Sequence, residues 1–214
     1  MIAPVETVGA AKAGLRAAVI AARRSAGAER RARASAQITR RVMDLPVVGA
    51  ARCVAAYVSF GTEPSTAELL AGISSRSVRV LLPVLRADLD LDWAIYDGTH
   101  HLTQGPRGVM SPDGPALGMA ALAEAEVVVV PALAVDRRGH RLGRGGGSYD
   151  RALVRAAPGA VVVAPIYEGE LLDHVPAEDH DRRVHLAVLP SGVHDLRAGP
   201  PDGLPDGLPD GPGT

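Results

Sequence analysis

Apolar residues near the start of the chain recur at helical spacing. Within residues 10–26, Leu15 and Val19 lie on one face, while arginines lie off it. This pattern predicts a helix over 10–26, and a second helix is expected over 29–45. A further helix is expected over 65–70, where a serine stands at the start of the segment.

Five later segments are continuously apolar rather than alternating. Strands that are buried on both faces show this pattern, because helices cover both sides of a parallel sheet. The alternation of these segments with helices predicts a three-layer α/β fold, Rossmann-like in its layering: a mostly parallel sheet with helices on both faces. The expected strands lie at 52–60, 78–84, 125–135, 159–166 and 184–190.

The composition bounds the domain organisation. The chain has 214 residues, of which 47% are hydrophobic, so it can bury a proper core. We expect a single α/β domain over 1–195. The end of the chain repeats Pro-Asp-Gly-Leu and lacks the residues of a core, so 196–214 is expected to be a disordered tail.

Charge and hydropathy limit the kinds of partner and the cellular compartment that we expect for this protein. The formal net charge is -1, which gives the whole protein no bias toward nucleic acid or membrane. No apolar run reaches the roughly 18 residues of a membrane span. The N-terminal region contains Glu6 and lacks a compact apolar segment, so a secretory signal is not expected. Although the Arg-rich segment 12–41 weakly resembles a mitochondrial transit sequence, we expect a cytoplasmic protein.

The segment HRLGRGGGSYDRAL, residues 140–153, is the strongest candidate site. Glycine permits close approach of backbone N–H groups and positive φ, and successive N–H groups at a helix start bind anions. Arg141 and Arg144 can add forked hydrogen bonds to phosphate oxygens, and Asp150 can hold magnesium. The segment follows the expected strand 125–135, and ligands bind beyond the carboxyl ends of parallel strands. It fits neither the dinucleotide fingerprint nor a Walker motif, but its chemistry fits nucleotide phosphates. The alternative is a flexible surface loop whose arginines are only solvated.

A second clue is the usage of basic residues. Of the 23 lysines and arginines, only Lys12 is a lysine. Lys12 can be a chance exception, or it can mark a site that needs a compact ammonium instead of a planar guanidinium.

Four motifs, in order and spacing, complete the pattern. The chain reads Lys-Ala-Gly-Leu-Arg at 12–16, places Glu63 three residues before Thr66, carries DRRGHRLGRGGGSYD at 136–150, and has Pro-Ala-Glu-Asp-His-Asp at 176–181. Together they resemble the 5-formyltetrahydrofolate cyclo-ligase (5,10-methenyltetrahydrofolate synthetase) family, whose motifs are K-x-x-L-R, E-x-x-T, D-x-x-G-x-R-L-G-x-G-x-G-Y-Y-D and P-x-E-x-H-D.

The resemblance implies an enzyme that uses ATP and Mg²⁺ to close 5-formyltetrahydrofolate to 5,10-methenyltetrahydrofolate through a phosphorylated formyl intermediate. By position, Lys12 and Arg144 would be catalytic. ATP would be bound by Lys12, Arg16, Arg141, Leu142, Gly143, Arg144, Gly145, Gly146, Gly147, Ser148 and Tyr149. The folate would meet Val58, Glu63 and Tyr149, and magnesium would be held by Asp150 and Asp181. The expected partner is a small reduced folate, with no nucleic acid and no membrane; the chain is a monomer or an oligomer of unknown size.

Two departures from the family pattern fall on the folate side. Ser148 stands where the family has the first of two tyrosines, and Ser111 stands where it has a glutamate. These changes keep open a nucleotide-binding paralogue with altered or lost folate activity. A further alternative is nucleic-acid binding through the N-terminal arginines, although the shortage of aromatic residues for stacking argues against it.

Overall fold

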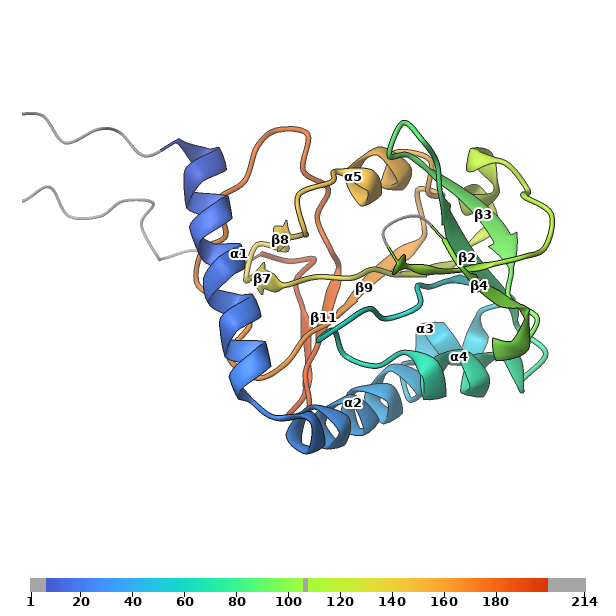
Figure 1. The fold of residues 1–214 in the computed structure, drawn as a ribbon, viewed down its shortest axis with the longest axis horizontal. Coiled ribbons are helices and arrows are strands. Elements are labelled where there is room, and N and C mark those ends of the chain that lie inside the picture. The colour runs from blue at the N-terminus through green and yellow to red at the C-terminus, as the bar shows by residue number, and fades with distance from the viewer. Residues whose placement is uncertain (1–6, 106–107, 200–214) are drawn as a thin grey trace, which may run out of the picture.

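The computed structural model describes residues 7–105 and 108–199 and has the expected α/β architecture (Figure 1). A seven-stranded sheet has the order β12-β11-β9-β6-β1-β2-β3. Its strands are β1 (Cys53–Ala55), β2 (Arg79–Leu85), β3 (Leu91–Ile95), β6 (Val127–Val129), β9 (Val161–Pro165), β11 (Leu186–Val188) and β12 (Val193–Asp195).

The five continuously apolar segments supply the parallel part of this sheet. β2, β1, β6, β9 and β11 pair in parallel, and only the edge strands β3 and β12 run antiparallel to their neighbours. Successive residues of a central strand enter opposite cores: Ala55 packs on one face, while Val54 packs on the other. Both faces of the sheet are therefore buried, as the continuously apolar segments predicted.

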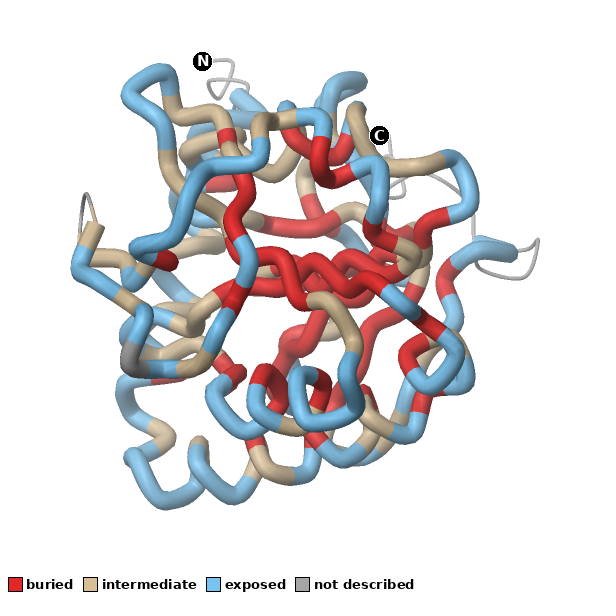
Figure 2. The backbone as a smooth tube through the Cα atoms, turned by 90° about the vertical axis from the view of Figure 1, so that its right-hand side faces the viewer, coloured by how far each residue is buried: buried red, intermediate tan, exposed pale blue. Residues whose placement is uncertain are grey.

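Helices cover the two faces of the sheet. Figure 1 shows α2, α3 and α4 below the sheet and α5 above it. The helices are α1 (Val8–Ser25), α2 (Ala28–Met43), α3 (Pro46–Ala50), α4 (Ala67–Ser74) and α5 (Ser148–Leu153), with 3-10 turns η1 (Thr99–His101) and η3 (Met119–Glu124). In Figure 2 the buried strands form a central red band that exposed segments surround. The expected helices 10–26 and 29–45 are thereby confirmed as α1 and α2.

Helix α1 packs against a second, smaller sheet. This sheet has the order β10-β7-β8, from β10 (Leu171–Leu172), β7 (Ala134–Asp136) and β8 (Arg141–Leu142). Leu15, Val19 and Ile20 of α1 contact its apolar side. Thr7 caps α1 by accepting a hydrogen bond from the N–H of Ala10 at 3.3 Å, and two arginines in the last turn complement the helix dipole.

The expectation of one strand over 125–135 is wrong. The segment divides into β6, in the main sheet, and β7, in the small sheet. Between them lies Pro131, which has no N–H to donate to a continuing ladder. Consequently the glycine segment (residues 143–147) does not directly follow β6, the parallel strand of the main sheet. It leaves the hairpin of β7 and β8, whose strands pair antiparallel, and leads into α5.

Other boundaries differ modestly from expectation. The segment 52–60 forms a strand only over Cys53–Ala55, and the expected helix at 65–70 begins at Ala67 and ends at Ser74. A short hairpin of β4 (Leu102–Gln104) and β5 (Met110–Pro112) was not predicted. Leu196, the first residue of the expected tail, packs into the main core, and 200–214 lie outside the described residues. Among the helices of the described residues, none is both long and apolar enough to span a bilayer.

Candidate active site

A single cleft of about 560 Å³ brings the sequence-predicted residues together. Its walls come from α1, the loop after β1, the chain from β8 into α5, and the loop between β10 and β11. Residues of β2, β3, the β4–β5 hairpin and the segment between β6 and β7 complete them. Every predicted site residue lines it: Lys12, Arg16, Val58, Glu63, Arg141, Leu142, Gly143, Arg144, Gly145, Gly146, Gly147, Ser148, Tyr149, Asp150 and Asp181. Ser111, the other departure from the family pattern, lines it too.

Two glycines of the segment have a backbone conformation that favours glycine. Gly145 has φ +98°, and a Cβ there would lie 3.5 Å from Cζ of Arg16. Gly147 caps α5 with φ +66°, and a Cβ there would lie 3.0 Å from Nη1 of Arg151. Both positions favour a residue without a side chain, because positive φ is strained for other residues. The glycine run therefore sets a specific loop shape beside a helix start.

Helix α1 is tied to this loop. Nε of Arg16 donates to the carbonyl of Gly143 at 2.8 Å. Lys12 lies one helical turn earlier on the same helix and lines the same cleft. The four-residue spacing of Lys12 and Arg16 thus places both cations on one side of α1, facing the same cleft.

The ammonium of Lys12 lies between two carboxylates. It donates to Asp181 at 2.6 Å and to Glu178 at 2.9 Å, and only 10% of the Lys12 side chain is exposed. Burial alone would lower the pKa of Lys12, but the hydrogen bonds and charges of both carboxylates outweigh it and raise that pKa. Burial likewise opposes the lowered pKa of Asp181, which the hydrogen bond from Lys12 produces. Both groups are held in their charged forms.

Asp150 is held at the start of α5. Its Oδ1 accepts from Nη2 of Arg141 at 2.7 Å and from the N–H of Arg182 at 3.0 Å. Arg141 also donates to the carbonyl of Arg182. The side chain of Arg141 is only 3% exposed, so this pair has little solvent screening.

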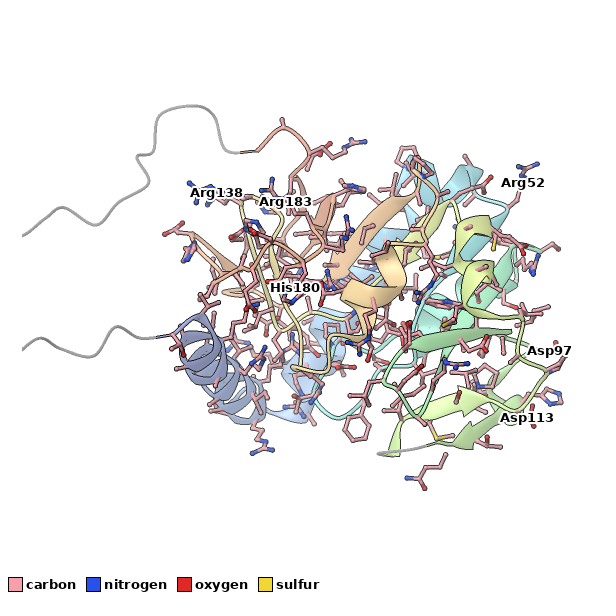
Figure 3. All side chains as sticks on the ribbon, turned by 90° about the horizontal axis from the view of Figure 1, so that it is seen from above. Arg52, Asp97, Asp113, Arg138, His180 and Arg183 are labelled. Carbon is pink, nitrogen blue, oxygen red and sulfur yellow. The ribbon has the colours of Figure 1, made fainter. Side chains whose placement is uncertain are left out.

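Oxygen donors suited to magnesium are present at the cleft. Mg²⁺ binds through carboxylates, waters and phosphate oxygens, and Asp150 and Asp181 supply such carboxylates. Ligand atoms of Glu178, His180 and Asp181 lie within 4.8 Å of one another. Of these three residues, only Asp181 was expected from the sequence to bind the metal. The Lys12 ammonium between two of these carboxylates indicates that a cation is stable there. His180 is 71% exposed at its side chain and lies between α1 and α5 in Figure 3. The residues therefore fit the metal.

Glu63 and Arg144 meet across the cleft. Nε of Arg144 donates to Oε1 of Glu63 at 2.8 Å, and the guanidinium lies 5.6 Å from the ring centroid of Phe60. The second oxygen of Glu63 accepts from the N–H of Phe60 at 2.8 Å. Glu63 is nearly buried at 7% side-chain exposure, whereas Arg144 is 43% exposed. A residue expected to bind folate thus pairs with one expected to bind ATP.

Sequence reasoning missed several residues of the cleft wall. Tyr57 and Phe60 lie beside the predicted Val58, and Pro131, Ala132 and Leu133 line the cleft where the chain passes from β6 to β7. The expected strand over 52–60 placed Tyr57 in a strand interior, whereas β1 ends at Ala55 and so leaves Tyr57 beyond its carboxyl end. Nothing in the local pattern at 131–133 indicated a site, because these residues read as the interior of a strand.

The comparisons with known proteins agree with this geometry. The 5-formyltetrahydrofolate cyclo-ligase family matches residues 8–190. The chain belongs to the 5-formyltetrahydrofolate cyclo-ligase family. A 5-formyltetrahydrofolate cyclo-ligase of Mycolicibacterium smegmatis is 45% identical over 153 residues, which cover 68% of this chain and 78% of the relative. That of Escherichia coli strain K12 is 29% identical, covering 80% of this chain and 96% of the relative.

Solved structures give the same family. The NMR structure of the Aquifex aeolicus 5,10-methenyltetrahydrofolate synthetase superposes with a TM-score of 0.76 at 25% identity, covering 94% of this chain and 98% of that one. A 5,10-methenyltetrahydrofolate synthetase from Mycoplasma pneumoniae has a TM-score of 0.68 at 15% identity, covering 84% and 98%, and supports the fold alone. As a member of the cyclo-ligase family, the chain is an enzyme.

Proposed function

We propose that the chain catalyses the ATP- and Mg²⁺-dependent cyclisation of 5-formyltetrahydrofolate to 5,10-methenyltetrahydrofolate, through a phosphorylated formyl intermediate. The observation that carries the proposal is the convergence of four motifs, far apart in the chain, on one cleft. The reaction needs two ligands side by side. The cleft offers cations and glycine N–H groups toward one, and a carboxylate beside apolar residues toward the other.

The first step is a phosphoryl transfer. The formyl oxygen attacks the γ-phosphorus of ATP, an oxygen–phosphorus bond forms, and the bond from the γ-phosphorus to the bridging oxygen breaks to release ADP. Such a transfer asks the protein mainly for positioning and for stabilisation of negative charge. Lys12, Arg16 and Arg144 would supply the charge, and Asp150 and Asp181 would hold Mg²⁺, which neutralises phosphate oxygens when bound.

The second step closes the ring. N10 of the folate attacks the activated formyl carbon and gives up its proton. The bond from that carbon to the formyl oxygen breaks, and the oxygen leaves as part of the phosphate, which takes up the proton. The protein needs no nucleophilic side chain for this step; it must hold N10 near the carbon and exclude water from the activated group. Glu63 would accept hydrogen bonds from N–H groups of the pterin, and Val58 would contact the ring.

A second candidate is a nucleotide-binding paralogue without this ring closure. Ser111 and Ser148, the departures from the family pattern, both line the cleft and so alter its surface directly. This candidate predicts that MgATP raises the melting temperature while 5-formyltetrahydrofolate adds nothing.

The test is the near-UV absorbance of the methenyl product. Purified full-length protein is incubated with 5-formyltetrahydrofolate and MgATP, with matched reactions that omit ATP or chelate the metal. Product that forms only in the complete reaction is expected. Folded protein that binds MgATP but forms no product would reject the cyclo-ligase activity in favour of the paralogue. We place the reaction in the cytoplasm, which fractionation of the native cells would test.

A further inference from the structure

Two tyrosine hydroxyls in the cleft wall have no hydrogen-bond partner. In the described part of the chain, buried side-chain atoms without a partner occur on Arg23, Tyr57, Arg79, Trp93, Tyr149 and Arg155. Of these residues, only Tyr57 and Tyr149 line the cleft. Buried hydroxyls are nearly always paired, so an unpaired one beside a ligand cleft calls for an explanation. Tyr149 is already expected to meet the folate, whereas Tyr57 has no assigned role.

The ring of Tyr57 is held firmly. It follows β1, is only 3% exposed, and packs in the core beneath the main sheet. Its backbone carbonyl accepts from Oγ1 of Thr66 at 2.7 Å, and that oxygen in turn accepts from the N–H of Ser59 at 2.9 Å. The core fixes the ring and the threonine fixes the backbone. The hydroxyl therefore has a defined position, as a binding group requires.

The surroundings keep both hydroxyls protonated. Burial raises the pKa of Tyr57 and of Tyr149, and the negative charge of Glu63 raises both further. The two oxygens of Glu63 already accept from Arg144 and from the N–H of Phe60, and neither tyrosine donates to them. This wall thus offers two unused O–H donors within electrostatic range of a carboxylate. A heterocycle with both acceptor atoms and N–H groups on its edge matches that arrangement.

We propose that the hydroxyl of Tyr57 donates a hydrogen bond to an acceptor atom, a carbonyl oxygen or a ring nitrogen, of the reduced pterin. Tyr57 is then a substrate-binding residue that helps to select the ring. The inference rests on the proposed function, since it takes the folate as the occupant of this part of the cleft. Bulk water does not reach the hydroxyl in the ligand-free protein. The proposal therefore requires small side-chain shifts that let the ligand reach it, and such shifts are common on binding.

The test is Tyr57→Phe in the full-length protein, which removes the oxygen and keeps the ring. The KM for 5-formyltetrahydrofolate, and its Kd by calorimetry, should rise about tenfold. The variant leaves an acceptor atom of the bound ligand without a hydrogen bond in a site that excludes water, and this weakens binding. The KM for ATP should stay unchanged. The melting temperature of the free protein should not fall, because the substitution deletes an unpaired polar atom from the interior.

Tyr167→Phe is the matched control. Its hydroxyl shares a 3.4 Å hydrogen bond with Ser35, and Tyr167 is not among the residues that line the cleft. This variant should keep the wild-type KM for both substrates.

Three results would overturn the inference. The first is a KM and Kd for 5-formyltetrahydrofolate in Tyr57→Phe that equal those of the wild type. The second is a variant in which only the KM for ATP rises. The third is a lower melting temperature with unchanged folate binding, which would give the hydroxyl a role in the fold alone. The wild-type reaction decides the proposed function independently. If wild-type protein neither binds nor converts 5-formyltetrahydrofolate, both proposals fail; if it does, the ratio of variant to wild type decides the role of Tyr57.

Discussion

The charged residues of the cleft form ion pairs with one another at the positions where ligands are expected to bind. Lys12 forms ion pairs with Asp181 and Glu178, Arg141 pairs with Asp150, and Arg144 pairs with Glu63. Buried and half-buried charges need such partners in the ligand-free protein, because an unpaired charge in a dry site is costly. Phosphates and a cation can replace these partners without leaving any charge alone. These pairs therefore agree with the proposal that charged ligands bind in the cleft.

The compact charge of Lys12 is tested by Lys12→Arg. A planar guanidinium keeps the charge but does not fit the same position between Asp181 and Glu178, so kcat/KM for ATP should fall on the order of 10²-fold. Circular dichroism should show an intact fold. Arg24→Lys, on an exposed part of the same helix, is the control and should be silent. Unchanged turnover in Lys12→Arg would remove Lys12 from the proposed mechanism.

The departure at Ser148 is tested by Ser148→Tyr. Ser148 lines the cleft at the start of α5, so a ring there can pack on the folate. We expect a lower Kd for 5-formyltetrahydrofolate, by about fivefold, with the Kd for MgATP unchanged. Calorimetric titration of each ligand measures both. Equal folate affinity in the two proteins would make the serine a neutral substitution.

Among the elements, α1 has the unusual position. It carries Lys12 and Arg16 to the cleft, yet it packs on the small sheet rather than on the main one. A buried ion pair fastens its far end: Arg23 donates to both oxygens of Glu170, at 2.7 and 2.8 Å, and to the carbonyl of Ala132 at 2.8 Å. Ala132 itself lines the cleft, so this pair links the docking of α1 to the shape of the site.

Glu170→Gln tests that fastening. It leaves the buried cation of Arg23 without its carboxylate, so the free energy of unfolding should fall by about 3–5 kcal/mol. Urea unfolding measures the change. The control is Glu29→Gln, which removes an exposed pair with Arg33 one helical turn away and should cost no more than about 0.5 kcal/mol. Equal midpoints for the two variants would contradict an anchoring role for Arg23.

The pairing of β9 with β11 has a pH-sensitive contact. Nδ1 of His185 accepts from the N–H of Val162 at 3.0 Å, which requires a neutral ring. Burial, followed by the charge of Arg197, lowers the pKa of His185 below its usual 6.5. The folded state therefore resists protonation, and the unfolded state binds the proton more readily. The contribution of neutral His185 to the free energy of unfolding is fully present above pH 6.5. It is lost as the pH falls from 6.5 toward the pKa of His185 in the folded state.

This contact predicts the shape of the stability profile. The denaturant midpoint of the wild type should decline as the pH falls below 6.5, and His185→Gln should flatten that decline. His174→Gln, at an exposed position, should keep the wild-type profile. A decline in His185→Gln as steep as that of the wild type would assign the acid sensitivity to other groups.

At the scale of the whole molecule, one ion pair joins the two parts of the cleft that we propose to bind ATP and the folate. Arg144 comes from the glycine segment, and Glu63 comes from the loop after β1. If ATP takes Arg144 and the folate takes Glu63, each ligand releases the partner that the other needs. Binding free energies coupled in this way are reciprocal, so each ligand should tighten the binding of the other by the same factor.

Calorimetry can measure this coupling. The Kd of 5-formyltetrahydrofolate should be at least about fivefold lower with a non-hydrolysable MgATP analogue than without it. Arg144→Gln removes the ion pair with Glu63 before any ligand binds. The factor by which one ligand tightens the binding of the other should therefore fall toward one in this variant. Independent binding of the two ligands to wild-type protein would refute the coupling.

The sequence alone determined the fold class and the identity of most groups in the cleft. Runs such as that at 159–166 are typical of strands buried on both faces, and the arginines and glycines of 140–153 favour anion binding. These are local signals, because hydrophobic periodicity and backbone freedom belong to short segments.

The tertiary structure alone decided which groups pair and how the chain reaches the site. The division of 125–135 between two sheets, the Lys12–Asp181 pair, and the unpaired hydroxyl of Tyr57 each depend on contacts between distant segments. Local patterns carry no information on such contacts, since packing and charge neutralisation are settled only when the elements meet. The sequence therefore specified the chemistry of the cleft, and the folded arrangement specified which of its groups remain available to a ligand.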